Sequence, residues 1–355
     1  MCDVHNPVLC VIPPYMLDKM VKNGTDEIRA VALNVMKQSR LFREQRSLVQ
    51  QQPGVNLQNL MSGVEAHSAQ LFRRVYNSNH TELLPGSLVR SEGDPPTNDP
   101  AVDEAYEGAG ATWQLYMDQY GRNSINDNGM IIDSTVHHGT NFNNAFWNSE
   151  QMVYGDGDEQ LFTRFTIDLD VIGHELTHGV TQYEAGLIYE FQSGALNESF
   201  SDVFGSLVKQ KKLGQDAEAA DWLIGANVLI GDNYALRSMK APGTAYQDHP
   251  ILGDDPQPAT MDDYQDLPRW DDGGGVHLNS GIPNHAFYLA AREIGGNAWE
   301  KAGLIWYRAL CDILNNNATF VKAAKATILA ARQEFGRGSM EVTAVRNAWK
   351  TVKVL

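Results

Sequence analysis

The segment His174-Glu175-Leu176-Thr177-His178 decides how this sequence of 355 residues is interpreted. It lies within DVIGHELTHGVTQY, where apolar residues recur at helical spacing. Two histidines four positions apart on a helix lie on one face, one turn apart, so both imidazoles can bind the same metal ion. Glu175 falls between them, where a general base for a metal-bound water belongs. A surface helix with two solvated histidines is the alternative interpretation.

A second segment with helical spacing, GALNESFSD, begins at Gly194. A catalytic zinc takes three protein ligands and keeps one open position, and two histidines with a carboxylate are a standard set. Glu198 is therefore the expected third ligand beside His174 and His178. Asp202 lies one turn further along the same face, where it can accept the N–H of a ligating histidine and fix its tautomer. The sequence thus predicts one catalytic Zn²⁺.

The run HELTHGVTQYEAGLIYEFQSGALNESFSD resembles the zinc-binding core of the thermolysin-like (gluzincin) peptidases. Similar pieces flank it in the expected order, namely Asn143-Asn144-Ala145-Phe146-Trp147, Ala235-Leu236-Arg237-Ser238-Met239 and the segment 272–281. The likeness covers most of the chain from about residue 55 onward. It implies an α+β fold of two lobes, the first β-rich and the second mainly α-helical, with the zinc cleft between them.

The same resemblance implies roles in catalysis. Glu175 matches the general base, which takes a proton from the zinc-bound water. Tyr189 and His277 match the residues that donate hydrogen bonds to the oxyanion of the tetrahedral intermediate. Asp272 matches the carboxylate that orients His277. The chain is therefore expected to be a zinc metalloendopeptidase.

Substrate binding is assigned through the resemblance as well. Arg237 would hold a substrate carbonyl, while Asn144 and the backbone of Ala145 would position the extended peptide. The positions that match the lining of the pocket after the scissile bond are all apolar: Phe162, Val171, Ile224 and Leu236. Cleavage on the N-terminal side of hydrophobic residues is expected, because such a pocket gains by burying an apolar side chain.

The N-terminal region resembles the short pro-segment of the protealysin-like branch. The motif Ile12-Pro13-Pro14-Tyr15-Met16-Leu17 carries this likeness and implies that residues 1–50 form a cleavable inhibitory pro-segment, with Pro13, Pro14, Tyr15 and Met16 in or beside the active site. An amphipathic stretch runs from Met16 to Met36, and the polar run from Lys37 to Gln52 is predicted to be an exposed, cleavable linker. For Cys10, a thiolate that caps the zinc and a free thiol both remain open.

The resemblance implies three regions. Residues 1–50 are the pro-segment, residues 51–184 the β-rich lobe that includes the HExxH helix, and residues 185–355 the helical lobe. The enzyme is thus expected to be made as a zymogen, a latent precursor that loses its propeptide.

Calcium binding is expected to differ from the family pattern. Asp170 and Asp221 match the family's double calcium site, but Lys209, Leu223 and Ala226 stand where acidic ligands are expected. Calcium takes six to eight oxygen ligands, so we expect this site to be lost or Lys209 to replace the ion. A calcium ion elsewhere, for example around Asp156 and Asp158, stays open.

Composition limits the partners. Lys and Arg number 28 against 44 Asp and Glu, and the resulting net charge of -16 disfavours nucleic acid and anionic membranes. Cys2, Cys10 and Cys311 are too few for a disulfide framework. The first residues lack the pattern of a secretory signal, so a location in the cytoplasm, or export without a standard signal peptide, is expected. Peptide or protein substrates and the chain's own pro-segment are the expected partners of a monomer.

Two other functions are kept as alternatives. An aminopeptidase can use the same zinc ligands, but would need an acidic cluster to capture the substrate amine. A binding protein with an inactive peptidase fold would typically have lost the base or a ligand, and these residues are all present.

Overall fold

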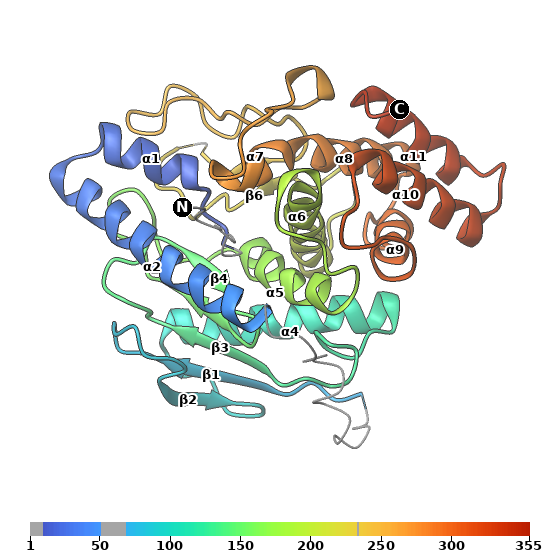
Figure 1. Ribbon diagram of the computed structural model, residues 1–355. Helices are drawn as coiled ribbons and strands as arrows, with labels where there is room; N and C mark the ends of the chain where they lie inside the picture. Colours follow the sequence, from blue (N-terminus) through green and yellow to red (C-terminus); the bar gives the residue numbers. More distant parts are fainter. Residues whose placement is uncertain (1–9, 51–68, 233) are drawn as a thin grey trace.

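The computed structural model describes residues 10–50, 69–232 and 234–355, with the side chains of 39–50 left out of the description. Within these ranges a mixed five-stranded sheet forms the lower part of the molecule in Figure 1. Its strands are β1 (Arg73–Asn77), β2 (Ser87–Ser91), β3 (Ile132–Val136), β4 (Ala145–Trp147) and β5 (Met152–Tyr154). The α+β class predicted from the sequence is confirmed.

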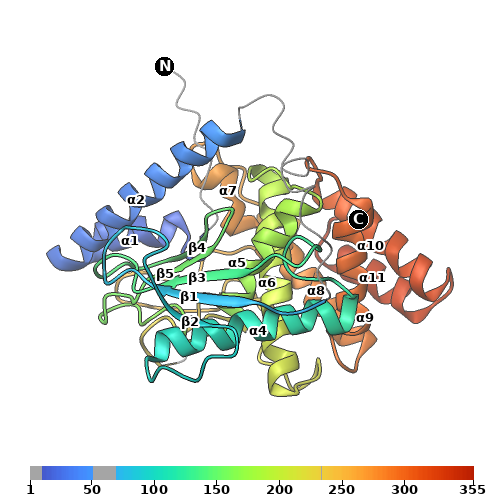
Figure 2. The same cartoon turned by 90° about the horizontal axis from the view of Figure 1, so that it is seen from below.

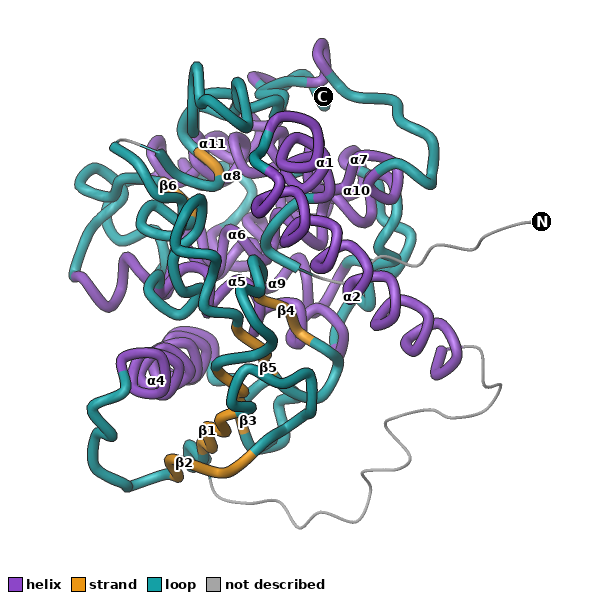
Figure 3. Tube along the Cα trace, turned by 90° about the vertical axis from the view of Figure 1, so that its left-hand side faces the viewer, coloured by secondary structure: helices purple, strands orange, loops and turns teal. Residues whose placement is uncertain are grey.

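The sheet has the strand order β2-β1-β3-β5-β4, and Figure 3 shows the strands stepping upward in this order. Strands β1, β3 and β5 are parallel, while β2 and β4 are antiparallel edge strands. The carboxyl ends of the three parallel strands therefore lie at the same edge of the sheet. The segment predicted to bind substrate backbone, Asn143 to Trp147, contains the edge strand β4.

Two helices pack on this sheet. Helix α4 (Pro100–Tyr120) packs against β1 and β3, and Figure 2 shows it running along the sheet. Asp99 caps its first turn by accepting the backbone N–H of Ala101, and Gly121 ends it in the left-handed conformation. Helix α5 (Leu169–Tyr183) carries the HExxH segment and packs against β4. The motif is thus held beside the edge strand.

The C-terminal half is mostly helical, as predicted. Helix α6 (Phe191–Leu213) packs along α5, and helices α8 to α11 lie at the right of Figure 1. The remaining elements are β6 (Leu223–Ile224), β7 (Arg237–Ser238), η1 (Met261–Asp263), α7 (Asp272–Asn279), α8 (Gly281–Ile294), α9 (Lys301–Arg308), η2 (Ala309–Ile313), α10 (Phe320–Phe335) and α11 (Met340–Thr351).

Glycines set the close approach of α5 and α6. A Cβ atom on Gly205 would lie 2.3 Å from the carbonyl oxygen of Asp170 and 2.9 Å from the backbone nitrogen of His174. A Cβ atom on Gly173 would lie 2.9 Å from the Cα atom of Gly205. Because neither position has room for a side chain, the two backbones can approach closely enough to bring their polar residues together.

The N-terminal segment forms two helices, α1 (Pro14–Asn23) and α2 (Asp26–Gln50), on the side of the molecule that faces the viewer in Figure 3. They correspond to the predicted amphipathic stretch, interrupted near Gly24. The prediction of a linker from Lys37 is wrong as far as Gln50, because α2 continues to that residue. Gln38 is buried and donates to Glu82, so this run contacts the sheet lobe despite its polar composition. Gln51 and Gln52 lie outside the described residues.

Among the described residues, no helix is both long and apolar enough to cross a membrane.

Candidate active site

Helices α5 and α6 bring the three predicted zinc ligands together. The Nε2 atoms of His174 and His178 lie 3.0 Å apart. Glu198 Oε2 lies 3.5 Å from His174 Nε2, and Glu198 Oε1 lies 3.3 Å from His178 Nε2. All three side chains are at most 1% exposed. We call this group of three residues the catalytic cluster.

Asp202 holds the outer side of His174. Its Oδ1 atom accepts a hydrogen bond from His174 Nδ1 at 2.8 Å, which leaves Nε2 directed at the cluster. The same carboxylate binds Arg237 through Nε and Nη2, both at 2.8 Å, and accepts from Asn284 Nδ2 at 2.8 Å. Burial raises the pKa of Asp202, but the charge of Arg237 and the contact with His174 outweigh it, so the pKa lies below its usual range.

The outer side of His178 is held by two residues that the sequence did not single out. Asn197 Oδ1 lies 2.8 Å from His178 Nδ1, and Ser201 Oγ lies 3.0 Å from the same atom. Both flank Glu198 on α6 at helical spacing, which is the only local signal for them. Asn284 had no such signal, because it comes from α8, 82 residues beyond its partner Asp202.

The residues of the catalytic cluster fit a zinc ion. Two imidazole nitrogens and a carboxylate form a standard zinc set. Each histidine has its Nδ1 atom occupied by an outer partner, which turns both Nε2 atoms toward the same point. Glu198 Oε2 is buried and accepts no hydrogen bond. A carboxylate buried between two Nε2 atoms is explained by a metal ion bound among the three side chains.

Tyr189, His277 and Asp272 lie next to this cluster. The hydroxyl of Tyr189 donates to Glu198 and lies 3.1 Å from His277 Nε2. His277 Nδ1 lies 2.5 Å from Asp272 Oδ1, and its backbone N–H donates to Asp272 Oδ2 at 2.9 Å. Burial lowers the pKa of His277, but the charges of Asp272 and Glu198 raise it more strongly, to about 9. His277 is therefore a hydrogen-bond donor at both ring nitrogens near neutral pH.

A turn of left-handed residues sets this geometry. Asp272, Gly273, Gly274 and Gly275 have φ values of 48°, 61°, 87° and 81°. A Cβ atom on Gly274 would lie 2.4 Å from the ring of Phe191. Glycine adopts such φ values without strain, and the turn folds Asp272 back onto the N-terminus of the helix that carries His277.

Glu175 lies inside the site. Its side chain is completely buried, and Oε2 accepts the backbone N–H of Trp147 at 3.0 Å. This bond joins the predicted general base to the end of β4. The predicted base and the predicted peptide-binding strand are therefore adjacent.

The N-terminal segment occupies the predicted peptide-binding strand. Cys10 forms an antiparallel bridge with Phe146, and Val11 N donates to the carbonyl oxygen of Ala145 at 3.2 Å. Ile12 N donates to Asn144 Oδ1 at 3.1 Å. Residues 10–12 thus lie along the edge of β4, joined to it by one bridge pair and by hydrogen bonds from Val11 and Ile12.

Two further predicted residues bind the carbonyl oxygens of this segment. Arg237 Nη1 donates to the oxygen of Val11 at 2.9 Å, and His277 Nε2 lies 3.1 Å from the oxygen of Cys10. The Cys10 thiol contacts the carbonyl oxygen of Ile12 at 3.6 Å. The motif residues continue directly from here, since Pro13 precedes α1 and Pro14 opens it.

The four apolar positions predicted to line a specificity pocket are completely buried: Phe162, Val171, Ile224 and Leu236. Leu236 N donates to the carbonyl oxygen of Ile224 at 2.9 Å, beside the β6–β7 pair. Val171 lies on α5, one turn before His174.

Lys209 lies where the sequence raised the question of calcium. Its Nζ atom is 2.7 Å from Asp170 Oδ2 and 2.9 Å from Asp221 Oδ1, and it donates to the oxygen of Leu223 at 2.7 Å. An ammonium group therefore pairs with both acids, as in one of the two expectations.

Asp156 and Asp158 do not converge on one point. Asp158 accepts three backbone N–H groups, from residues 160, 161 and 162, and the side-chain amide of Asn143. Asp156 binds His137 instead. The carboxylate of Asp158 thus accepts hydrogen bonds from its own turn and from Asn143.

Comparison with known proteins places the chain in context. The family model for the thermolysin metallopeptidase catalytic domain matches residues 40–182, and that for the thermolysin metallopeptidase alpha-helical domain matches residues 185–354. An extracellular metalloprotease of Pectobacterium carotovorum subsp. carotovorum is 49% identical over 351 residues, which cover 98% of this chain and 97% of the relative. Protease PrtS of Photorhabdus sp. (strain Az29) is 45% identical over 97% of this chain and 91% of its own.

A solved structure is also similar over nearly the whole chain. The precursor of protealysin, a metalloproteinase from Serratia proteamaculans, has a TM-score of 0.86 and 47% identity, and the match covers 98% of this chain and 99% of that one.

Proposed function

Since the chain belongs to the thermolysin family of metallopeptidases, we propose that it cuts internal peptide bonds on the N-terminal side of hydrophobic residues. It is a metalloendopeptidase, and the family does not favour the aminopeptidase or the inactive binding protein. The proposal concerns the roles of individual residues, the specificity and the latency.

One observation carries the proposal. The main chain of residues 10–12 lies along β4 and is bound at successive backbone groups by Ala145, Asn144 and Arg237. On the side of residues 10–12 these contacts use only main-chain groups. Extended substrates of many different sequences can therefore make the same contacts. The strand passes beside His277, next to the catalytic cluster. An internal stretch of peptide fits this arrangement.

The chain's own groups have distinct roles in cutting the bond. His174, His178 and Glu198 would hold a zinc ion, which would supply Lewis acidity and an activated water at neutral pH. Glu175 accepts the proton from the attacking water and passes it to the leaving amine, since it is held at the end of β4. Tyr189 and His277 donate to the oxygen that becomes negatively charged, and Asp272 keeps His277 oriented.

Specificity follows from the four buried apolar positions. Phe162, Val171, Ile224 and Leu236 are proposed to surround the side chain that follows the scissile bond. A pocket of this kind favours Leu, Ile, Val or Phe, because burial of apolar area contributes about 25 cal/mol per Å². Charged residues at this position of the substrate would lose their hydration without a compensating partner.

Latency is proposed to arise from residues 1–50. Val11 and Ile12 of this segment occupy groups that would bind a substrate main chain, so a peptide cannot bind until the segment leaves. The similarity to a protealysin precursor supports this reading of the N-terminus. Pro13 and Pro14 would make the segment a poor substrate, since proline is stiff and lacks an amide donor. The remaining chain would be divided near residue 184 into its two lobes.

The test is hydrolysis of an end-blocked peptide with a central Gly-Leu bond. Three proteins are compared: the full-length chain, a chain that lacks the first 50 residues, and the truncated chain with Glu175→Ala. The truncated protein should cut before Leu, a zinc chelator should stop it, and the full-length chain should show a lag. Glu175→Ala should lose at least about a hundredfold in rate.

Other outcomes would replace the proposal. A folded, zinc-loaded chain that cuts nothing would be a binding protein. Cleavage restricted to peptides with a free amino terminus would make it an aminopeptidase. A Cys10→Ala chain with the same lag as the full-length protein would exclude the thiolate as the cause of latency.

Three further proposals concern the surroundings of the enzyme. A relative is named an extracellular metalloprotease, so we propose that this protein acts outside the cell, which fractionation of a culture would test. We propose a monomer, to be tested by light scattering. We also propose that no calcium binds between Asp170 and Asp221, because the ammonium group of Lys209 lies there.

A further inference from the structure

A second group of metal-ligating residues lies at the carboxyl edge of the sheet. His80 follows β1 by three residues, His137 directly follows β3, and Asp156 lies two residues after β5. Because these three strands are parallel neighbours, the topology brings the residues together although they are far apart in the chain. We call His80, His137 and Asp156 the strand-end cluster.

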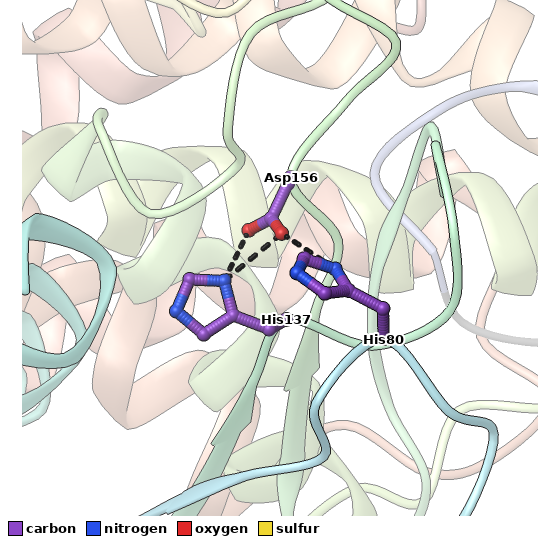
Figure 4. Close-up of side chains that lie close together, drawn as sticks. All are labelled: His80, His137 and Asp156. Atoms are coloured by element: carbon purple, nitrogen blue, oxygen red, sulfur yellow. Dashed lines mark hydrogen bonds and ion pairs between the residues drawn. The ribbon is translucent and has the colours of Figure 1, made fainter.

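The side chains of this cluster converge, as Figure 4 shows, with the carboxylate of Asp156 between the two imidazole rings. His137 Nδ1 lies 2.9 Å from both oxygens of Asp156, and His80 Nδ1 lies 3.4 Å from Oδ2. One ligand atom from each of the three residues lies within 4.8 Å of the others. The three residues thus offer two nitrogens and one oxygen to a common point.

These separations match those of a zinc site. Ligand atoms about 2.0 Å from a tetrahedral zinc ion lie about 3.3 Å from one another. The strand-end cluster has nitrogen–oxygen distances of 2.9 and 3.4 Å, and the catalytic cluster has corresponding distances of 3.3 and 3.5 Å. The catalytic cluster serves as an internal standard, since its residues belong to a zinc-enzyme family.

The backbone holds the two histidines in place. His80 N donates to the carbonyl oxygen of His137 at 2.8 Å, so the two turns are joined directly. Both residues have positive φ, 58° for His80 and 54° for His137. Histidine, like asparagine and aspartate, is enriched among the few non-glycine residues in this conformation, so the backbone accommodates both histidines.

A fourth residue supports His137 from the other side. Asp99 Oδ2 lies 2.9 Å from His137 Nε2. A carboxylate that accepts the outer N–H of a ligating histidine is the usual arrangement in zinc sites. Asp202 has the same relation to His174 in the catalytic cluster.

The local charge favours a cation. The carboxylates of Asp156 and Asp99 each lie 2.9 Å from a ring nitrogen of His137. Arg164 is the positive side chain nearby, but Glu104 binds it with two bonds of 2.7 and 2.5 Å and so neutralises it. Two carboxylates therefore remain to balance a divalent ion.

We propose that His80, His137 and Asp156 form a second zinc site, with Asp99 orienting His137. The side chain of His80 is 59% exposed, so an ion can enter from solvent. Water would complete the coordination, as three protein ligands leave one position open. The ion would join the ends of three strands to the capped end of α4. Imidazole ligands favour zinc over calcium.

The test measures zinc bound per chain in full-length protein that carries Glu175→Gln, which prevents self-digestion. The protein is dialysed against zinc alone and analysed for metal, and binding is followed by calorimetry. We expect two zinc ions per chain. His80→Asn tolerates the left-handed backbone and removes the imidazole, and Asp156→Asn removes the charge. Each should weaken the second site by about tenfold or more.

The control is Asn79→Gly, which changes the neighbouring residue of the same turn and is compatible with its φ of 50°. It should bind two zinc ions. One zinc ion per chain in the parent protein would overturn the proposal. A second ion that persists unchanged in both His80→Asn and Asp156→Asn would also overturn it, because the ion would lie elsewhere. Calcium at the same concentration should not displace the second zinc ion.

Discussion

The catalytic cluster and the strand-end cluster use the same chemistry in opposite surroundings. Both consist of two histidines and a carboxylate with similar spacing, and in both an aspartate holds the outer nitrogen of one histidine. The catalytic cluster is buried between two helices, whereas His80 in the strand-end cluster is 59% exposed. The clusters therefore separate the effect of ligand geometry from the effect of burial.

The aspartate that binds the outer histidine nitrogen has a different second role in each cluster. Asp202 is inaccessible and neutralises the buried guanidinium of Arg237 besides orienting His174. Asp99 is partly exposed and also caps α4. Loss of the carboxylate charge should thus lower the free energy of unfolding strongly at Asp202 and only slightly at Asp99, although both residues support a histidine.

The largest effect is expected from Asp202→Asn. The zinc affinity of the catalytic cluster should fall roughly ten- to hundredfold, since His174 loses its orienting charge. The free energy of unfolding should fall by about 3–5 kcal/mol, because Arg237 stays buried without its partner. Competition with a chelator and urea unfolding measure the two quantities.

The control for this change is Asp312→Asn, whose carboxylate pairs with Arg308 on the surface at 3.4 Å. It should alter the free energy of unfolding by about 0.5 kcal/mol or less. If Asp202→Asn were as mild as this control, burial would not distinguish the two clusters.

A second prediction concerns the buried ion pair between Lys209 and Asp170. Lys209→Met leaves the completely buried Asp170 without its ammonium partner, so the free energy of unfolding should fall by about 3–5 kcal/mol. Lys211→Met, two residues along the same helix, breaks a more exposed pair with Asp118 and should cost about 0–1 kcal/mol. Calcium should leave the urea midpoint of the parent protein unchanged; a clear rise would show that Lys209 does not replace the ion.

Helix packing is the basis of a third prediction. Gly205→Ala places a methyl group against the backbone of Asp170 and His174, and should lower the free energy of unfolding by about 1–3 kcal/mol. The catalytic zinc should bind more weakly, while the strand-end cluster, built on other elements, should keep its affinity. Gly338→Ala is the control, because a Cβ atom there meets nothing within 4 Å. Equal loss at both clusters would mean that the variant is generally unfolded.

Local patterns explain what could be predicted from the sequence. Four site residues lie within two helical segments. The four-residue spacing puts His174 and His178 on one face of α5, and Glu198 and Asp202 on one face of α6. The division into a β-rich lobe and a helical lobe was implied by the resemblance to the thermolysin-like peptidases. Resemblance supplied the more distant residues, such as Arg237 and His277, which no spacing rule connects to the motif.

What escaped prediction depends on contacts between distant segments. Asn284 reaches Asp202 only through the packing of helices, and His80 meets His137 only because β1 and β3 are parallel neighbours. The run after Lys37 was predicted to be a linker because its composition is polar. In the structure it continues helix α2, and Gln38 is buried. Propensity and composition are weak where tertiary contacts decide the outcome.

Asp99→Asn should change the stability less than Asp202→Asn, Lys209→Met or Gly205→Ala does. Asparagine caps a helix as well as aspartate does, so α4 should keep its first turn. Without metal, the free energy of unfolding should change by about 1 kcal/mol or less, since the pair with His137 is partly exposed. The affinity of the second zinc ion should nevertheless fall roughly ten- to hundredfold, as measured by calorimetry. An unchanged zinc affinity would show that Asp99 does not orient His137. A loss of stability as large as that of Asp202→Asn would show that burial does not explain the difference between the two clusters.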